Sequence, residues 1–237
     1  MNKLLIVQNI TREGPGLLDE VLREEQIDYD LVNLDGGDQF PSPESYGAVV
    51  VLGGPDSAND TTDKMTSELS QVRTVLDRNI PYLGICLGLQ VAVKAGGGKV
   101  VPGTVKEIGL FDMDGQQNTL QVTEAGMEDP LLNGLGSTLK VFQLHGETVE
   151  TTDSMQVLAT GKHCRNQIVK VGPQAYGIQS HFELTPGMLA LWAAEDPDLI
   201  PLGKDNLLRD FKAIETEYTQ IGKALLRNFI ALAGLRK

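Results

Sequence analysis

Short apolar segments alternate with segments of helical periodicity through the first part of the chain, and this alternation most restricts the possible fold. Strands buried on both faces of a parallel sheet have this continuous apolar character. The intervening stretches place apolar residues three or four positions apart, which is typical of crossover helices. The apolar segments are 4–7, 29–34, 48–52 and 82–85, and the helical positions are Leu17, Leu18, Val21, Leu22, Met65, Leu69, Val72, Val75 and Leu76. The pattern predicts the α/β class, with a doubly wound, mostly parallel central sheet flanked by helices.

The pattern changes between residues 100 and 179. Short β-rich pieces at 140–144, 167–171 and 175–179 are separated by Gly and polar turns, and they predict antiparallel strands added to the sheet. Two helices are expected after them, at 186–195 and about 206–233. We expect the apolar stripe of the second helix to face the core, although a dimer seam is an alternative. The stripe consists of Phe211, Ile214, Tyr218, Ile221, Leu225, Phe229 and Leu232.

The length of 237 residues is compatible with one large domain or two small ones. Hydrophobic residues make up 41% and charged residues 22%, as in an ordinary globular protein. No repeat divides the chain, and the Pro-containing turn at 195–201 separates two helices without marking a domain boundary. We expect a single domain over 1–237, with a C-terminal helical extension at about 203–237.

The net charge of −12 disfavours broad contact with nucleic acid, which would require a basic face. No apolar stretch reaches the length of a membrane span, and the first apolar run is too short for a signal peptide. The two cysteines match neither a metal-ligand spacing nor a disulfide framework. We therefore expect a cytoplasmic protein with no nucleic-acid partner, no membrane partner, no metal and no cofactor; a homo-oligomer remains open.

The Gly-Ile-Cys-Leu-Gly segment at 84–88 joins an expected strand to an expected helix. It is the cysteine counterpart of the nucleophile elbow, in which a sharp turn exposes the nucleophile. Glycines two residues before and after the nucleophile let the chain fold back closely. A helix that starts directly after Cys86 would favour its thiolate form, because the N–H groups and the positive dipole end lie near the sulfur.

A His-Phe-Glu segment at 181–183 follows an expected strand. In an extended chain His181 and Glu183 point to the same side, while Phe182 points into the core. Imidazole can transfer the proton in acyl transfer, and a carboxylate fixes its tautomer and stabilises the imidazolium. Together with Cys86, these residues form a candidate catalytic triad.

The Gly-Gly-Pro turn at 53–55 also ends an expected strand, at the sheet edge where α/β proteins gather ligands. The backbone N–H groups of Gly54 and of Leu87, the residue after the nucleophile, are candidate oxyanion-hole donors for a tetrahedral intermediate.

With these motifs the chain resembles the class I, or triad-type, glutamine amidotransferases, and among them the lone proteins similar to the glutaminase part of GMP synthetase. Segments 105–109, 141–148 and 166–167 resemble intervening family segments in the same order, so that the similarity spans about 4–192. The resemblance implies Cys86 as nucleophile, His181 as general base and acid, Glu183 as orienting carboxylate, and Gly54 with Leu87 as oxyanion donors. It further implies substrate contacts for Gln90 and for the backbone at Leu144 and His145.

Phe182 departs from the family pattern, which commonly has proline between the catalytic His and Glu. Since an extended Phe preserves the alternation, we expect altered rigidity rather than lost catalysis. We expect a structural or substrate-positioning role for His145, and no catalytic role for His163 and Cys164, which lie in a polar, turn-like stretch. Too few ligands with recognisable spacing are present for a zinc site.

The resemblance implies hydrolysis of the glutamine side-chain amide through a γ-glutamyl thioester, with ammonia passed to an acceptor on a separate synthetase. The nucleotide-binding loop of the GMP synthetase type is missing from the sequence, so the chain alone is not expected to make GMP. Two alternatives remain: a freestanding hydrolase or transferase of γ-glutamyl peptides or conjugates, and a non-enzymatic binding protein that retains the fold. A ThiJ/PfpI-type cysteine protein has a similar elbow, but the late His-x-Glu and the Gly-Gly-Pro segment fit it poorly.

Overall fold

The computed structural model describes residues 3–236, and its centre is a nine-stranded sheet with the order β2-β1-β3-β4-β11-β10-β9-β6-β7. The first five strands in this order run parallel: β2 (Tyr29–Asn33), β1 (Leu4–Gln8), β3 (Ala48–Val51), β4 (Tyr82–Ile85) and β11 (Ala175–Ile178). The others pair antiparallel: β10 (Ile168–Gly172), β9 (Gln156–Thr160), β6 (Thr119–Val122) and β7 (Thr138–Lys140). The predicted α/β fold with added antiparallel strands is confirmed.

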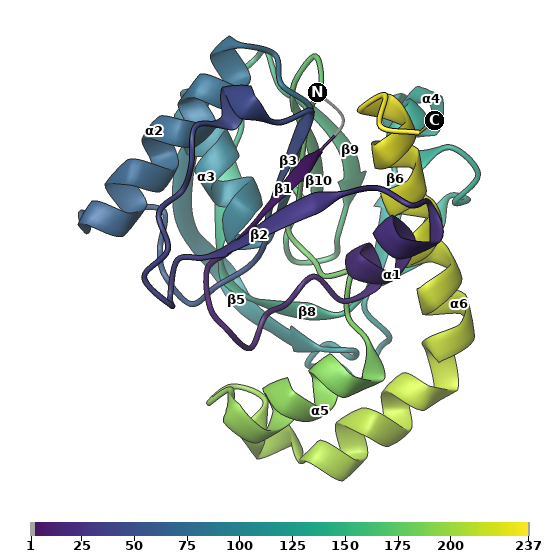
Figure 1. The fold of residues 1–237 in the computed structure, drawn as a ribbon. Helices are drawn as coiled ribbons and strands as arrows, with labels where there is room; N and C mark the ends of the chain where they lie inside the picture. The colour runs from purple at the N-terminus through teal and green to yellow at the C-terminus, as the bar shows by residue number, and fades with distance from the viewer. Residues whose placement is uncertain (1–2, 237) are drawn as a thin grey trace.

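Helices cover both faces of the sheet (Figure 1). Leu4 and Ile6 of β1 belong to the core with α1 (Leu17–Glu24), α5 (Pro186–Glu195) and α6 (Lys204–Leu232). Leu5 and Val7 belong to the core on the other face, with α2 (Asp63–Asp77) and α3 (Leu87–Ala95). Successive side chains of a strand point to opposite faces, so the continuous apolar run fills two cores. The short helices are η1 (Pro43–Ser45), α4 (Glu124–Glu128), η2 (Pro130–Leu132) and η3 (Ile200–Leu202).

A second, two-stranded sheet is formed by β5 (Lys99–Gly109) and β8 (Gln143–Glu150). The strand predicted at 140–144 was wrong in its bounds, because β7 ends at Lys140 and β8 begins at Gln143 in the other sheet. Between them Val141 and Phe142 are fully buried, and Phe142 forms an isolated bridge with His181. The apolar run therefore reflects burial of the crossing between two sheets and not one continuous strand.

The apolar stripe of α6 packs inside its own chain, as predicted. Phe211, Ile214, Tyr218, Leu225 and Phe229 are buried in the core, and Ile221 and Leu232 are partly buried against it. These side chains are thus not available for the alternative dimer seam. Within residues 3–236 no helix is both long enough and apolar enough to cross a membrane.

Candidate active site

Cys86 lies in a strained turn between β4 and α3. Its backbone has φ 52° and ψ −105°, in the left-handed half of conformational space that side chains rarely adopt, and it is the N-cap of α3. Its N–H donates to the carbonyl of Ile178 at 2.7 Å. A Cβ on Gly84 would lie 2.6 Å from the nitrogen of Leu89 and closer still to the backbone of Gly88. The two glycines therefore permit the close approach that the elbow requires.

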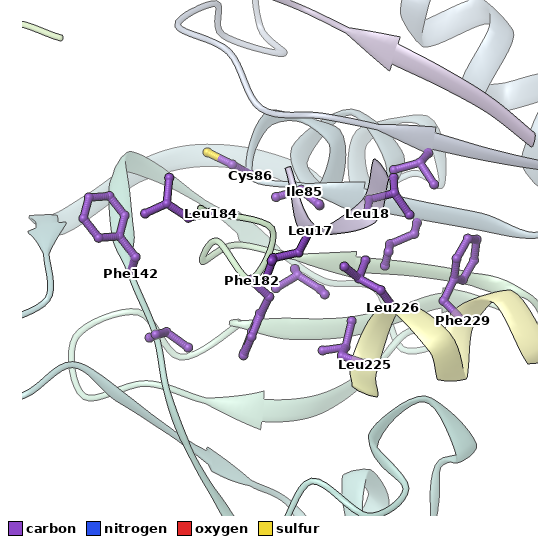
Figure 2. Close-up of a cluster of buried hydrophobic side chains, with 14 of the residues drawn as sticks. Leu17, Leu18, Ile85, Cys86, Phe142, Phe182, Leu184, Leu225, Leu226 and Phe229 are labelled. Atoms are coloured by element: carbon purple, nitrogen blue, oxygen red, sulfur yellow. The ribbon is translucent and has the colours of Figure 1, made fainter. Parts of the chain in front are cut away.

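The thiol of Cys86 lies where the hydrophobic core meets a pocket. Figure 2 shows the residue at the margin of a buried apolar cluster, with the sulfur directed away from Ile85, Leu17 and Leu18. The sulfur lies 3.7 Å from the carbonyl oxygen of Leu144 and 3.7 Å from Nε2 of Gln179. Polar atoms of β8 and of the residue after β11 thus face the sulfur.

His181 and Glu183 form a buried pair beside Cys86. Nδ1 of His181 lies 2.6 Å from Oε1 of Glu183, and the ring of Trp192 packs against the imidazole edge-on at 5.0 Å. Burial lowers the pKa of His181, but the charge of Glu183 and the interaction with Cys86 outweigh this, so that the pKa lies well above its usual value. The pair is arranged to hold a proton on the imidazole close to the sulfur.

The C-terminal helix α6 contacts the backbone of the segment that contains His181 and Phe182. The Tyr218 hydroxyl donates to the carbonyl of His181 at 2.7 Å. Gly222 lies so close to the carbonyl of Phe182 that a Cβ at this position would collide with that oxygen. The backbone of the candidate base is thus fixed by residues that follow it by about forty positions in sequence.

Gly53 and Gly54, after β3, lie against the elbow. A Cβ on Gly53 would lie 3.2 Å from Cε1 of His181 and 3.5 Å from Cβ of Cys86, and one on Gly54 would lie 3.4 Å from Cδ2 of Leu87. Leu87 is the first residue of α3, so its N–H has no acceptor within the helix. The structure brings both candidate oxyanion donors to the side of Cys86.

A pocket of about 590 Å³ opens at the sulfur, within the size range of small-molecule sites. Five residues singled out in the sequence line it: Gly54, Cys86, Gln90, Leu144 and His145. Nε2 of Gln90 lies 3.4 Å from the carbonyl oxygen of Glu147 and 3.4 Å from Oε1 of Gln179. Leu87, His181 and Glu183 do not line the pocket; the imidazole and carboxylate are 1% and 2% exposed behind it.

His145 belongs to a buried cluster with Glu107 and Cys164, whose potential ligand atoms lie within 4.8 Å of one another. Its Nε2 lies 3.2 Å from Oε2 of Glu107, and its Nδ1 lies 3.0 Å from the carbonyl oxygen of Glu147. Burial raises the pKa of Cys164 to about 11, so the thiol of the cluster is protonated at neutral pH. The cluster links β5 to β8.

Glu13 is a pocket residue that the sequence interpretation missed. It lies in the loop after β1, is 5% exposed and lines the same pocket as Cys86. Burial raises its pKa to about 7, and the nearby charge of His181 opposes this rise. The one available signal in the sequence was its position after a strand, at the ligand-binding edge of the sheet. This signal is weak, because charged residues are common in surface loops.

Comparisons with known proteins identify the family of the chain. The family model for class-I glutamine amidotransferases matches residues 16–190, and the chain belongs to this family. A protein of Salmonella typhimurium described as glutamine amidotransferase-like (YfeJ) is 33% identical over 150 residues, which cover 61% of this chain and 60% of that protein. One of the subunits of the glutamine-hydrolysing GMP synthase of Sulfolobus acidocaldarius is 31% identical over 143 residues, covering 60% of this chain and 69% of that protein.

Other relatives are much longer. The match to the glutamine-hydrolysing GMP synthase of Paraburkholderia phymatum, at 25% identity, covers 78% of this chain but 34% of that enzyme. Among solved structures, a glutamine amidotransferase from Methylobacillus flagellatus superimposes with a TM-score of 0.85 at 24% identity, covering 98% of this chain and 95% of that one. One from Thermotoga maritima superimposes with a TM-score of 0.84 at 23% identity, covering 96% and 97%. These structures share the fold.

Proposed function

We propose that this chain hydrolyses the side-chain amide of glutamine through a γ-glutamyl thioester on Cys86 and releases ammonia for an acceptor on a separate synthetase. The observation that carries the proposal is the buried His181–Glu183 pair beside a cysteine held in an elbow at the base of a pocket. Membership of the amidotransferase family supports it, as does the similarity to a protein described as one of the subunits of a glutamine-hydrolysing GMP synthase.

In the proposed reaction the sulfur of Cys86 attacks the amide carbon while the oxygen gains negative charge. We assign the stabilisation of that charge to the N–H groups of Gly54 and Leu87. The C–N bond then breaks as His181 gives its proton to the departing nitrogen, which leaves the thioester and ammonia. Water loses a proton to His181 and attacks the thioester, so that the S–C bond breaks and glutamate is released. Glu183 keeps the imidazole in the required orientation throughout.

The lining of the pocket suggests how the glutamyl part binds. Gln90 and the backbone of Leu144 and His145 lie on the side of α3 and β8, and we assign them the amino acid end of the substrate. The Ser57 hydroxyl lies 3.1 Å from Oε1 of Glu147 and closes this side.

A freestanding hydrolase of γ-glutamyl peptides or conjugates is the second candidate. The observation that favours it is the size of the pocket, about 590 Å³, because pockets in this range take ligands larger than glutamine. A non-enzymatic binding protein is the third, and the intact Cys86, His181 and Glu183 arrangement argues against it.

The test is hydrolysis of glutamine and of γ-glutamyl peptides by the wild-type chain and by Cys86→Ala, together with mass spectrometry after treatment with a glutamine-derived diazoketone. We expect labelling of Cys86 and loss of all hydrolysis in the variant. Equal activity of the two proteins would refute the mechanism. A clear preference for γ-glutamyl peptides over glutamine would favour the freestanding enzyme.

A further inference from the structure

Glu13 presents a buried carboxyl group to the pocket without a partner from the chain. The side chain is 5% exposed, yet among residues 3–236 no cationic group forms a salt bridge with it and no side chain hydrogen-bonds to it. A buried carboxyl group without a partner is unfavourable, and buried charges are normally paired. A group that is absent from the chain itself is therefore the natural partner of this carboxylate.

The other charged side chains at the pocket already form salt bridges or hydrogen bonds within the chain. Arg12 pairs with Asp196 at 2.7 Å, Lys106 pairs with Asp198, and Asp56 pairs with Lys64 at 2.7 Å. Oε1 of Glu147 accepts a hydrogen bond from the Ser57 hydroxyl. The lining holds two cationic side chains, Arg12 and Lys106, and five acidic ones, so its net charge is negative when the carboxyl groups are ionised. A pocket of this kind favours a positively charged ligand.

Glu13 lies on the side of the pocket next to His181. Its carboxylate and the imidazole both lie against Gly53. Trp192, which packs against His181, donates from its indole nitrogen to the carbonyl of Arg12 at 2.9 Å. In acyl transfer the leaving nitrogen departs next to the general acid. The carboxylate of Glu13 thus lies on the His181 side of the pocket, where the leaving amine of the proposed reaction would depart.

We propose that Glu13 determines substrate specificity by binding a positively charged amino group on the leaving amine, so that the preferred substrates are γ-glutamyl amides of diamines. This inference rests on the proposed thioester mechanism and on the second candidate function, a freestanding hydrolase of γ-glutamyl conjugates, and it names the substrate class. The bonds that form and break are those given above for glutamine: the amide nitrogen takes the proton of His181 and departs as the free diamine. Water then releases glutamate from Cys86, and the second nitrogen of the diamine stays protonated throughout.

The experiment compares kcat/KM for three amides: glutamine, the γ-glutamyl amide of 1,4-diaminobutane, and the γ-glutamyl amide of pentylamine. The last two have similar length and differ in the terminal charge. We expect the wild-type chain to prefer the charged amide over the neutral one by roughly 10- to 100-fold, as for a hydrogen bond to a charged group. Glu13→Gln keeps the shape of the side chain and should reduce this ratio to about one.

Glu147→Gln is the matched control, because it removes a pocket carboxylate on the Ser57 side. It should keep the preference for the charged amide, and circular dichroism establishes that each variant is folded. Cys86-dependent hydrolysis of all three amides without any charge preference would overturn the role of Glu13 and leave the proposed function standing. A preference that persists in Glu13→Gln would also overturn it. No Cys86-dependent hydrolysis of any amide would overturn both.

Discussion

The backbone N–H of Phe182 donates a hydrogen bond to Oε2 of Glu183 at 3.0 Å, while Oε1 of the same carboxylate lies 2.6 Å from Nδ1 of His181. One carboxylate is thus held by its own chain and by the imidazole that it orients. Proline, which the resemblance described in the sequence analysis leads us to expect at this position, has no N–H to donate. The side chain of Phe182 is also 1% exposed and belongs to the core of Figure 2. Its replacement by proline would therefore remove two interactions.

We expect Phe182→Pro to lower the free energy of unfolding by about 3–5 kcal/mol, because it empties a site filled by a buried aromatic ring. It should also lower kcat, since Glu183 loses a hydrogen bond. Phe182→Leu retains the N–H and much of the apolar volume, and it should keep kcat near the wild-type value. Denaturant unfolding and steady-state kinetics measure the two effects. A kcat of Phe182→Pro equal to that of wild type would show that the N–H does not position Glu183.

Glu183→Gln should lower kcat by about 10²- to 10⁴-fold, since the amide orients the imidazole poorly and cannot stabilise the imidazolium. Stopped-flow or steady-state assay of glutamate release measures the change. Glu217→Gln, on the exposed face of α6 where it pairs with Lys140, is the control and should leave kcat unchanged. A loss of less than threefold in Glu183→Gln would argue against the orienting role.

Gly84→Ala should destabilise the fold by about 2–5 kcal/mol, because its Cβ would collide with the backbone of Gly88 and Leu89 and backbone cannot give way cheaply. In Gly187→Ala, in the first turn of α5, the added Cβ would have only Thr185 Oγ1 nearby, at 3.9 Å. That control should be neutral or slightly stabilising, since Ala is the better helix former. Thermal and denaturant unfolding distinguish the two, and similar stabilities would contradict the close-packed elbow.

Glu68 should make stability depend on pH. The residue is fully buried in α2 and accepts a hydrogen bond from Asn9, and its burial raises the pKa from 4.5 to about 7. Below pH 4.5 the carboxyl group is protonated in both the folded and the unfolded state. As the pH rises to about 7, the unfolded state ionises first, so the folded state loses stability relative to it.

The free energies of unfolding of wild type and Glu68→Gln should therefore diverge in favour of the variant between pH 4.5 and 7. The divergence should reach about 3 kcal/mol on top of any constant offset. Urea unfolding at closely spaced pH values measures the difference, in which contributions from other groups cancel. A difference that does not change with pH would contradict the buried, uncharged carboxyl group.

The preference for a charged leaving amine should rise with pH. Burial, opposed by His181 and Arg12 and aided by Glu183 and Asp196, puts the pKa of Glu13 near 7, so the carboxylate forms as the pH passes through that value. A primary ammonium group stays protonated over this range. The ratio of kcat/KM for the charged and neutral amides should therefore increase from pH 6 to pH 8 in wild type and stay constant in Glu13→Gln. Parallel pH profiles of the two proteins would contradict this.

Much of the fold follows from local patterns in the sequence. The strands of the parallel half and the helices α1, α2, α5 and α6 correspond to periodic apolar segments, and the candidate triad lies at the ends of β4 and β11. Pairing across the sheet was not predictable, because it joins residues far apart in sequence. The apolar pattern of the sequence predicted one strand at 140–144, where the structure has the end of β7, a connection and the start of β8. The buried connection between the two sheets has the same apolar residues as a strand.

The two residues near the site whose roles escaped prediction have no distinctive local pattern. Glu13 lies in an ordinary Gly-Pro turn, and Tyr218 is one apolar position among several in α6. Their significance depends on tertiary contacts with His181 and with the pocket. The elbow, by contrast, was recognisable because a strained turn and two close approaches leave a fixed spacing of small residues around Cys86.

The contact of α6 with the segment around His181 has a consequence for the chain as it is made. The ribosome releases Cys86 before the backbone that carries His181, and that backbone is secured by Tyr218 and Gly222, which emerge later still. Domains are synthesised from the N-terminus, so the nascent chain exposes its cysteine before the residues that complete the site. We therefore expect Cys86 to be less reactive in ribosome-bound intermediates that lack α6 than in the chain in which α6 has folded.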